Sequence, residues 1–357
     1  MHIVIFGLTV SSSWGNGHAT LWRSLIEALD RDGHDIVFFE QDTPYYRAHR
    51  DRPELGGRAR LELYPTWETV RRMASELLPS ADVAIVTSYC PDGRAACELV
   101  LGSRAGLKVF YDLDTPVTLA RLAGGEDVSY LPERGLRDFD LVLSFTGGQA
   151  LELLQSRLGA RRVAPLYGSV DPDHHRPTPG TVSWASACSY LGTWSLDRER
   201  GVDTLFLEPA RRHAAPFVIG GSLYPPTIEW PSNIMRVEHV PPADHSAFYC
   251  SSPITVNVTR RAMASLGYCP SGRLFEAAAC GVPVLSDSWD GLEEFFTPGE
   301  DILLATDSDS ALAAITLPRA ELAQIGQRAR QRALDEHTGT RRAAQLLEIL
   351  ESTGGPS

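Results

Sequence analysis

The chain has 357 residues, of which 43% are hydrophobic and 22% are charged, as is typical of a globular protein long enough for two domains. Its formal net charge of −12 argues against nucleic-acid and anionic-membrane partners, because it would repel both at long range. A single lysine, Lys108, and the lack of a GxxxxGK[ST] sequence exclude a P-loop and leave little room for lysine chemistry.

The six cysteines form no CxxC pair and have no histidine partners at metal-ligand spacing. We therefore expect reduced thiols, no disulfide framework and no metal site. The first residues lack a basic segment and no apolar run reaches 18 residues, so we expect neither secretion nor a membrane span. The sequence predicts a cytoplasmic protein and gives no indication of its oligomeric state.

Short apolar runs alternate with helical patterns through the first half of the chain. This pattern is typical of parallel strands that crossover helices bury on both faces. We expect one doubly wound α/β sheet with strands near residues 2–7, 35–40, 83–87, 107–111, 141–145 and 162–167.

Residues 11–18, SSSWGNGH, connect the first of these strands to an amphipathic helix. Asn16 is a plausible N-cap for this helix, which we expect to end before Gly33. The helix has an apolar stripe with the spacing of a buried face, formed by Trp22, Leu25, Ile26 and Leu29.

The same loop is a weak match to a dinucleotide-binding fingerprint. Gly15 and Gly17 supply two of the three glycines, and Glu40 ends the second strand near the place of the ribose-binding acid. The third glycine is missing, and the excursion from residue 8 to residue 15 is longer than a pyrophosphate cradle uses. We therefore do not expect a dinucleotide at this loop.

Residues 169–183 are rich in Pro, Asp and His and form the best linker candidate. After them the alternation restarts, with strands expected near residues 187–191, 216–219, 234–238, 254–258, 282–286 and 301–304. We expect a first domain at 1–168, a linker at 169–183, a second domain at 184–336 and a C-terminal helix with a tail at 337–357. Two helices, interrupted near residues 337–339, end the chain.

One helix of the second half carries an electrostatic anomaly at its start. Ser271 can cap a helix that runs from Gly272 to Cys280, with Arg273 in its first turn. A cation is disfavoured there by the helix dipole, and an anion bound at the helix N-terminus would remove the anomaly. The alternative is that Arg273 pairs with Glu276 or with another acid.

Several motifs, in order along nearly the whole chain, resemble group 1 glycosyltransferases, specifically the CgeB-like (spore maturation protein) branch. They are SSSWGNGHATLWRSL, FYDLDTPVTLARL, LSFTGG, LYGSVDP, YLGTWSLDR, NVTR, RLFEAAACGVPVLSDSWDGLEEFFTPGEDILLA and EHTGTRRAAQLLE. The resemblance implies a GT-B fold, in which two Rossmann-like domains face across a cleft. It also implies that the C-terminal domain holds the nucleotide-sugar, that the N-terminal domain holds the acceptor, and that the last helix crosses back to the N-terminal domain.

The resemblance assigns donor-binding roles to residues of the second half. Glu276 matches the second glutamate of the family's Glu-x7-Glu motif, which binds the ribose hydroxyls, and Tyr268 replaces the first glutamate. Candidate donor-sugar contacts are Tyr268, Trp289, Asp290 and Gly291. The family's diphosphate-binding Arg falls on Thr193 and its Lys falls near Arg200. Candidate diphosphate ligands are therefore Gly192, Thr193, Arg198, Arg200, Arg260, Ser271 and Arg273, of which two or three arginines should be structural.

On the acceptor side, the resemblance points to Ser13, Trp14 and Gly17 in the first loop and to Asp112 and Asp114. The two aspartates mimic a metal-binding DxD motif, but Asp114 precedes Thr115-Pro116 at a helix start, so we favour a structural or acceptor-contact role for them. We expect no metal cofactor for the transfer.

His18 stands where inverting relatives of this fold place the acceptor's general base. A neutral imidazole suits deprotonation of a hydroxyl, which makes His18 the candidate catalytic residue. Two alternatives stay open: a contact in the cleft without proton transfer, and a purely structural role.

The resulting hypothesis is a glycosyltransferase that moves a sugar from a nucleoside-diphosphate donor, of the UDP or TDP type, to a hydroxyl of a small molecule or glycan. A sugar-nucleotide epimerase or isomerase on the same fold is one alternative. A non-catalytic sugar-nucleotide-binding protein of coat assembly is another, to which Tyr268 in place of glutamate is the one pointer.

Overall fold

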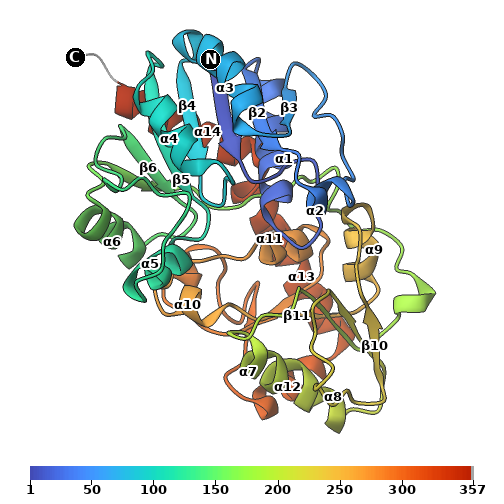
Figure 1. Cartoon of the computed structure of the whole chain (residues 1–357). Helices are drawn as coiled ribbons and strands as arrows, with labels where there is room; N and C mark the ends of the chain where they lie inside the picture. The colour runs from blue at the N-terminus through green and yellow to red at the C-terminus, as the bar shows by residue number, and fades with distance from the viewer. Residues whose placement is uncertain (355–357) are drawn as a thin grey trace. The chain divides into compact units, whose positions relative to one another are not determined.

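The computed structural model describes residues 1–354, which divide into two compact units. Unit 1 contains Met1–Gly168 and the last helix from Gly339 onward, and unit 2 contains Ser169–Thr338. Each unit is built on one parallel β-sheet with helices packed against it (Figure 1). The expected tail beyond residue 354 lies outside the described residues.

The sheet of unit 1 has seven parallel strands in the order β3-β2-β1-β4-β5-β6-β7. Its order reverses between β1 and β4, which are neighbours in the sheet although two other strands separate them in the chain. The strands are β1 (His2–Gly7), β2 (Asp35–Gln41), β3 (Arg60–Tyr64), β4 (Val83–Thr87), β5 (Leu107–Asp112), β6 (Leu141–Ser144) and β7 (Val163–Pro165).

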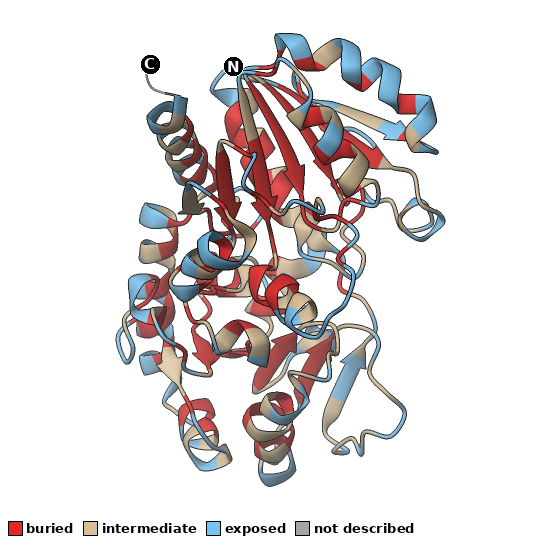
Figure 2. Cartoon of the chain, turned by 60° about the vertical axis from the view of Figure 1, so that its left-hand side comes forward, coloured by how far each residue is buried: buried red, intermediate tan, exposed pale blue. Residues whose placement is uncertain are grey.

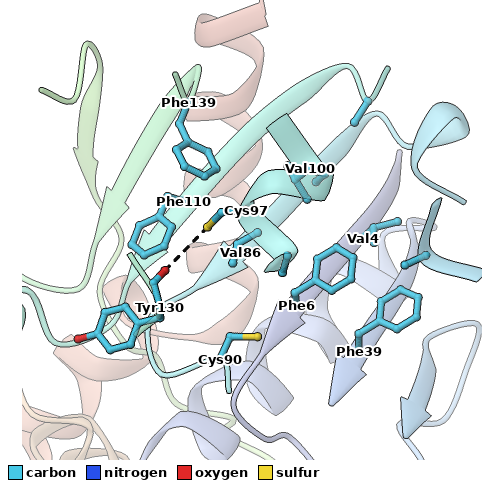
Figure 3. Packing of buried hydrophobic residues seen from close by; sticks show 14 of the residues in the cluster. Val4, Phe6, Phe39, Val86, Cys90, Cys97, Val100, Phe110, Tyr130 and Phe139 are labelled. Atoms are coloured by element: carbon cyan, nitrogen blue, oxygen red, sulfur yellow. Dashed lines mark hydrogen bonds between the residues drawn. The ribbon is translucent and has the colours of Figure 1, made fainter. Parts of the chain in front are cut away.

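Both faces of this sheet are covered, which explains the continuous apolar runs in its central strands (Figure 2). Because successive side chains of a strand point to opposite faces, Val4 and Phe6 pack with Phe39 and Phe110 on one face. Figure 3 shows this cluster, in which the thiol of Cys97 donates to the carbonyl of Tyr130. The other face carries the alternate residues of the same strands, which form a second cluster.

The helices of unit 1 are α1 (His18–Arg31), α2 (Pro44–Arg47), α3 (Trp67–Leu77), α4 (Gly93–Leu101), α5 (Thr115–Ala123), α6 (Gln149–Leu158) and α14 (Gly339–Gly354). Helices α3 and α4 contribute to the first cluster, and α1 and α14 contribute to the second. The predicted apolar stripe of α1 is buried in full, as expected from its spacing.

Helix α14 packs against α1 from its first residue. A Cβ on Gly339 would lie 2.5 Å from Oγ of Ser24, so only glycine permits this approach. Further along, Nη2 of Arg342 donates to the carbonyl of Gly168 at 3.1 Å. These contacts place the last helix of the chain in the same compact unit as the first.

The sheet of unit 2 has six parallel strands in the order β10-β9-β8-β11-β12-β13. Counted within the unit this is 3-2-1-4-5-6, the Rossmann order, and its reversal lies between β8 and β11. The strands are β8 (Cys188–Leu191), β9 (Phe217–Gly220), β10 (Ile234–Val237), β11 (Thr255–Asn257), β12 (Val284–Ser286) and β13 (Leu303–Leu304).

The helices of unit 2 are α7 (Glu199–Val202), α8 (Glu208–Arg212), α9 (His245–Cys250), α10 (Arg261–Ala264), α11 (Gly272–Ala279), α12 (Ser308–Ile315) and α13 (Arg319–Glu336). A π-helical turn, Asp203–Leu207, joins α7 to α8. Helix α11 packs on β11 and β12 and contacts α9 and α13. The two expected C-terminal helices are therefore α13 and α14, which are separated at residues 337–338.

The prediction of two parallel α/β sheets is confirmed, and all twelve predicted strands are present within a few residues. Strand β3 was not predicted, because Arg60, Glu62 and the residues between and after them alternate in polarity at the edge of the sheet instead of forming an apolar run. All six cysteines are free thiols, as expected, and five of them are buried. No helix among the described residues is long and apolar enough to cross a membrane.

Candidate functional site

In open parallel sheets, ligands bind beyond the carboxyl ends of the strands where the strand order reverses. In unit 2 this point lies at the ends of β8 and β11, next to Leu191 and Val258. Most of the predicted donor-binding residues belong to the loops that follow these two strands and to the start of α11.

Arg273 lies directly over this point. Its Nη1 donates to the carbonyl of Leu191 at 3.0 Å and its Nη2 to the carbonyl of Val258 at 3.4 Å. The guanidinium also lies 5.6 Å from the ring centre of Tyr190. The alternative that Arg273 pairs directly with an acid is not seen, because its hydrogen bonds go to backbone carbonyls and to Ser271.

Arg198 supplies a second half-buried cation beside Arg273. Its Nη1 donates to the carbonyl of Thr193 at 3.2 Å. Burial lowers the pKa of Arg198, and the charges of Arg273 and Arg260 lower it further. Arg260 differs, since its Nε lies 3.0 Å from Oδ2 of Asp197. Among residues 1–354, no carboxylate lies within ion-pair distance of Arg198 or Arg273, so two neighbouring positive charges are left for an anion.

Arg200 does not join this group. It is exposed on α7, two residues beyond Arg198, and no ion pair or hydrogen bond involves its side chain in the described chain. The sequence prediction that Arg200 takes the family's Lys position is therefore not supported by its placement, because its charge is left to solvent.

The backbone of Gly192 lies directly against the guanidinium of Arg273. A Cβ at this position would lie 2.8 Å from both Nη1 of Arg273 and the hydroxyl of Tyr190, so a side chain would displace the guanidinium. The hydroxyl of Tyr224 donates to the Gly192 carbonyl at 2.7 Å. Gly221, with φ of +140°, also approaches that carbonyl so closely that a Cβ would lie 2.1 Å away. The loops after β8 and β9 are thus fitted to each other.

Ser271 occupies the predicted N-cap position of α11, but its hydroxyl accepts from Nε of Arg273 at 3.0 Å instead of capping the helix. The first backbone N–H groups of α11 consequently have no side-chain cap. The dipole of this uncapped helix start and the charge of the two neighbouring guanidiniums both favour an anion at this place.

Glu276 is buried on α11, one turn beyond Arg273. Its Oε2 accepts from the hydroxyl of Tyr249 at 3.1 Å and lies 3.6 Å from Nδ1 of His245. Burial alone would raise the pKa of Glu276, but the neighbouring His245 and His175 and the Tyr249 hydroxyl lower it to about 2. The carboxylate is therefore ionised at neutral pH, and its Oε1 faces the start of the helix at Gly272.

The predicted donor-sugar residues divide into two groups. Tyr268, with φ of +48°, donates its backbone N–H to the carbonyl of Asp290 at 2.7 Å, and its ring fills the space where a Cβ on Gly291 would lie. These three residues therefore meet. Trp289 is different: it is 5% exposed and its ring packs against Phe295, so the prediction of a sugar contact for its side chain is wrong.

In unit 1 the corresponding reversal point lies between β1 and β4, and the loop of residues 8–17 follows β1 there. Buried Glu40 holds this loop. It accepts from the N–H groups of Val10 and Ser11 at 2.7 and 3.0 Å, and from the hydroxyls of Thr9 and Ser11 at 3.0 and 2.6 Å. Because loop donors occupy both oxygens, Glu40 is not placed to bind a ribose.

His18 is the first residue of α1. Asn16 Oδ1 accepts from the N–H groups of His18 and Ala19, so the expected capping by Asn16 is present, although Gly17 occupies the N-cap position. The imidazole lies 5.5 Å from the ring of Tyr89, which follows β4. Burial lowers the pKa of His18 to about 4, so the ring is neutral at physiological pH. Its Nδ1 is buried without a hydrogen-bond partner among the described residues.

The other first-loop candidates are held by neighbouring side chains. The Ser13 hydroxyl donates to Oδ2 of Asp51 at 2.8 Å, and Asp51 in turn pairs with Arg23 at 2.7 Å. The Trp14 ring stacks on His49 with centres 4.2 Å apart. Gly17 has φ of −93° and open space where a Cβ would be, so the turn requires glycine at Gly15, with φ of +68°, and not at Gly17.

Asp112 and Asp114 differ in how far they are buried. Asp112 is inaccessible, its Oδ1 accepts from the Thr118 hydroxyl at 3.1 Å, and burial raises its pKa to about 6. An acceptor contact by Asp112 is therefore wrong, and a structural role is correct. Asp114 accepts from the Tyr89 hydroxyl at 3.0 Å and thereby belongs to the surroundings of His18.

Sequence analysis assigned no role to four residues that the fold places in these sites: Tyr89, His175, His245 and Tyr249. The histidines are distant in sequence from each other and from Glu276, so no spacing motif joins them. Tyr89 carries one usable signal, since it directly follows a buried strand at a point where the sheet order reverses. Its φ of +63° is strained for tyrosine and coincides with its place beside His18.

Comparisons with known proteins agree with this architecture. Residues 198–348 match the family described as glycosyl transferase-like. Sucrose-phosphate synthase from Thermosynechococcus elongatus superposes with a TM-score of 0.72 at 15% identity, over 98% of each chain. HepE from Anabaena, solved with UDP-glucose, gives 0.67 at 14% identity, over 99% of this chain and 100% of the other.

An α-glucosyltransferase in complex with UDP gives a TM-score of 0.69 at 13% identity, over 98% of this chain and 99% of the other. The same kind of enzyme has also been solved with UDP and DNA. No curated protein matches the chain. The chain has the GT-B fold, with two Rossmann-like domains, and carries a glycosyl transferase-like region.

Proposed function

We propose that the protein is a glycosyltransferase that takes a sugar from a nucleoside-diphosphate donor bound in unit 2. The observation that carries the proposal is the pair of half-buried guanidiniums of Arg198 and Arg273, neither of which has a carboxylate within ion-pair distance in the described chain. They lie where a Rossmann sheet binds ligands, beside an uncapped helix start. Charge that develops on a diphosphate leaving group would be stabilised by these fixed cations.

The remaining donor contacts follow from the same geometry. Glu276 Oε1 faces the start of α11 and suits the ribose hydroxyls, while Oε2 is held by its neighbours. Tyr268, Asp290 and Gly291 form the candidate sugar-binding group. UDP is the preferred nucleotide, because the structural neighbours were solved with UDP or UDP-glucose. Arginine supplies the charge that a metal would otherwise bring to the diphosphate, so no divalent ion is proposed there.

The acceptor is proposed to be a hydroxyl-bearing small molecule or glycan that binds to unit 1 near His18, Tyr89 and Asp114. A net charge of −12 disfavours DNA as acceptor. A pKa of about 4 makes His18 a weak base at neutral pH, so we assign it a hydrogen-bonding contact in place of obligatory proton transfer. The sequence motifs favour the CgeB-like branch, and the free thiols suit a reducing, cytoplasmic environment.

A thermal-shift screen with UDP, TDP, GDP and ADP sugars tests the donor site, because a ligand that binds only the folded state raises Tm. A positive donor is then incubated with and without candidate acceptors and the products are separated by HPLC. Acceptor-dependent release of nucleotide supports transfer, whereas an altered sugar nucleotide without acceptor supports the epimerase alternative. Stabilisation by none of these nucleotides would contradict the proposal, and stimulation by Mg²⁺ or Mn²⁺ would contradict metal-free binding of the diphosphate.

A further inference from the structure

A second cluster of polar side chains lies in unit 2. One ring nitrogen of His175, one of His245 and one carboxylate oxygen of Glu276 all lie within 4.8 Å of one another. We propose that these three residues bind a divalent zinc ion that ties the segment around residue 175 to α9 and α11. The inference does not depend on the proposed function. It concerns Oε2 of Glu276, whereas the proposed ribose contact uses Oε1, and it involves no step of sugar transfer.

The hydrogen bond of His245 determines which nitrogen faces the carboxylate. Nε2 lies 3.2 Å from the carbonyl of Val240, and because a carbonyl can only accept, Nε2 must carry the proton. Nδ1 of the neutral ring then presents a lone pair to Oε2 of Glu276. A metal-binding histidine usually donates one ring N–H to a backbone carbonyl or carboxylate and binds the metal through its other nitrogen, and the ring of His245 is oriented in this way.

The distance between these two atoms fits a shared metal better than a direct bond. Nδ1 of His245 lies 3.6 Å from Oε2 of Glu276, which is beyond hydrogen-bond length. Two ligand atoms at typical zinc distances and a tetrahedral angle are separated by about 3.4 Å. A cation between the lone pair and the carboxylate would remove their repulsion and satisfy both.

His175 provides an independent observation. It is 5% exposed, and neither of its ring nitrogens has a hydrogen-bond partner within residues 1–354. An imidazole buried without partners loses its hydration without compensation, which destabilises the folded protein. Its ring lies 6.0 Å from that of His245, and one of its nitrogens completes the cluster. A metal ligand role accounts for this otherwise uncompensated burial.

The backbone that carries His175 is held in place without a metal. Ser246, the second residue of α9, donates through Oγ to the carbonyl of His174 at 2.7 Å and accepts from the N–H of Arg176 at 3.4 Å. These two bonds bracket His175. Tyr249 on the same helix donates to Oε2 of Glu276, which fixes the carboxylate. The three ligands are therefore pre-positioned by one short helix.

The ligand set selects the ion. Two neutral imidazoles and one carboxylate suit zinc, whereas Mg²⁺ and Ca²⁺ prefer oxygen ligands only. A water molecule would complete four-coordination. Because Oε1 of Glu276 still faces the start of α11, metal binding through Oε2 leaves the donor-side oxygen available.

The test uses the full-length protein purified without chelator after growth in zinc-supplemented medium. Metal content is measured by mass spectrometry, and the zinc is then replaced by Co²⁺ for visible absorption. His175→Ala and His245→Ala are compared with the matched control His174→Ala, which changes an adjacent, exposed histidine paired with Asp171. We expect about one zinc per chain and an intense tetrahedral Co²⁺ spectrum in the wild type and the control.

In the two ligand variants we expect zinc affinity to fall roughly 100-fold or more, as measured by competition with a chelating dye. Far-UV circular dichroism checks their fold, and the Co²⁺ spectrum of the wild type tests the site without any variant. Substoichiometric zinc, an octahedral Co²⁺ spectrum or equal loss of metal in His174→Ala would overturn the proposal.

Discussion

Arg273 donates a hydrogen bond from Nη1 to the carbonyl of Leu191 at 3.0 Å, which joins the start of α11 to the end of β8. The bond holds the guanidinium over the point where the sheet order of unit 2 reverses. Because Nη2 reaches the end of β11 as well, the cation is fixed by backbone and not by an acid. No carboxylate lies within ion-pair distance of this guanidinium in the described chain, and the proposed diphosphate site rests on that arrangement.

The first prediction compares UDP binding after substitution of half-buried Arg198 and of its exposed neighbour Arg200. Arg198→Ala removes one of the two uncompensated guanidiniums, so we expect the Kd for UDP to rise roughly 10- to 100-fold, as for a charge-assisted hydrogen bond of about 1.5–3 kcal/mol. Arg200→Ala, two residues away and exposed, should change Kd by less than about twofold. Isothermal titration calorimetry measures both, and equal effects would show that the diphosphate lies elsewhere.

The second prediction concerns the backbone approach at Gly192. Gly192→Ala places a methyl group 2.8 Å from Nη1 of Arg273, so the guanidinium must move and UDP binding should weaken at least roughly tenfold. Gly17→Ala is the matched control, because its Cβ would have no neighbour within 4 Å and its φ is negative. Calorimetric titration with UDP compares the two variants. Unchanged affinity in Gly192→Ala would mean that Arg273 does not contact the nucleotide.

The third prediction concerns the first loop of unit 1. Glu40→Gln replaces an acceptor of four loop hydrogen bonds by a side chain with one acceptor oxygen, which leaves buried loop donors unsatisfied. We expect a loss of roughly 2–4 kcal/mol in the free energy of unfolding. Glu133→Gln, an exposed change in the same unit, should cost less than about 0.5 kcal/mol. Urea denaturation distinguishes them, and equal midpoints would show that Glu40 does not hold the loop.

The sequence was sufficient to predict the two parallel sheets, because strands buried on both faces leave continuous apolar runs. It also predicted the helix from Gly272, although the Ser271 side chain does not cap it as expected. The partners of Arg273 could not be predicted, because the carbonyls of Leu191 and Val258 belong to loops that only the sheet order brings together.

The same limit explains the errors at single residues. Nothing local distinguishes half-buried Arg198 from exposed Arg200, and only the fold shows that Arg198 turns back to the carbonyl of Thr193. Asp112 ends a strand in a motif that resembles a metal site, yet tertiary packing buries it against Thr118. The partners of His175 lie 70 and more residues away in the chain, so only the folded structure brings them into one cluster.

The last prediction concerns His18, whose pKa of about 4 lies below the ordinary value of 6.5. Between these values the unfolded chain binds a proton that the folded chain does not, so the free energy of unfolding should fall as pH drops from 6.5 towards 4. His18→Gln lacks this titration and should show a flatter dependence across that window. Urea denaturation at several pH values measures the difference, with the exposed substitution His174→Gln as control.

The same variant decides how His18 contributes to transfer. If its neutral ring only makes a hydrogen bond, His18→Gln should keep kcat/KM within about tenfold of the wild type, while His18→Ala should lose more. An essential base would instead cost both variants roughly 100-fold or more, because an amide cannot take up the acceptor proton. Initial rates with the donor and acceptor identified in the screen distinguish the two outcomes. Equal and large losses would restore His18 as the catalytic base.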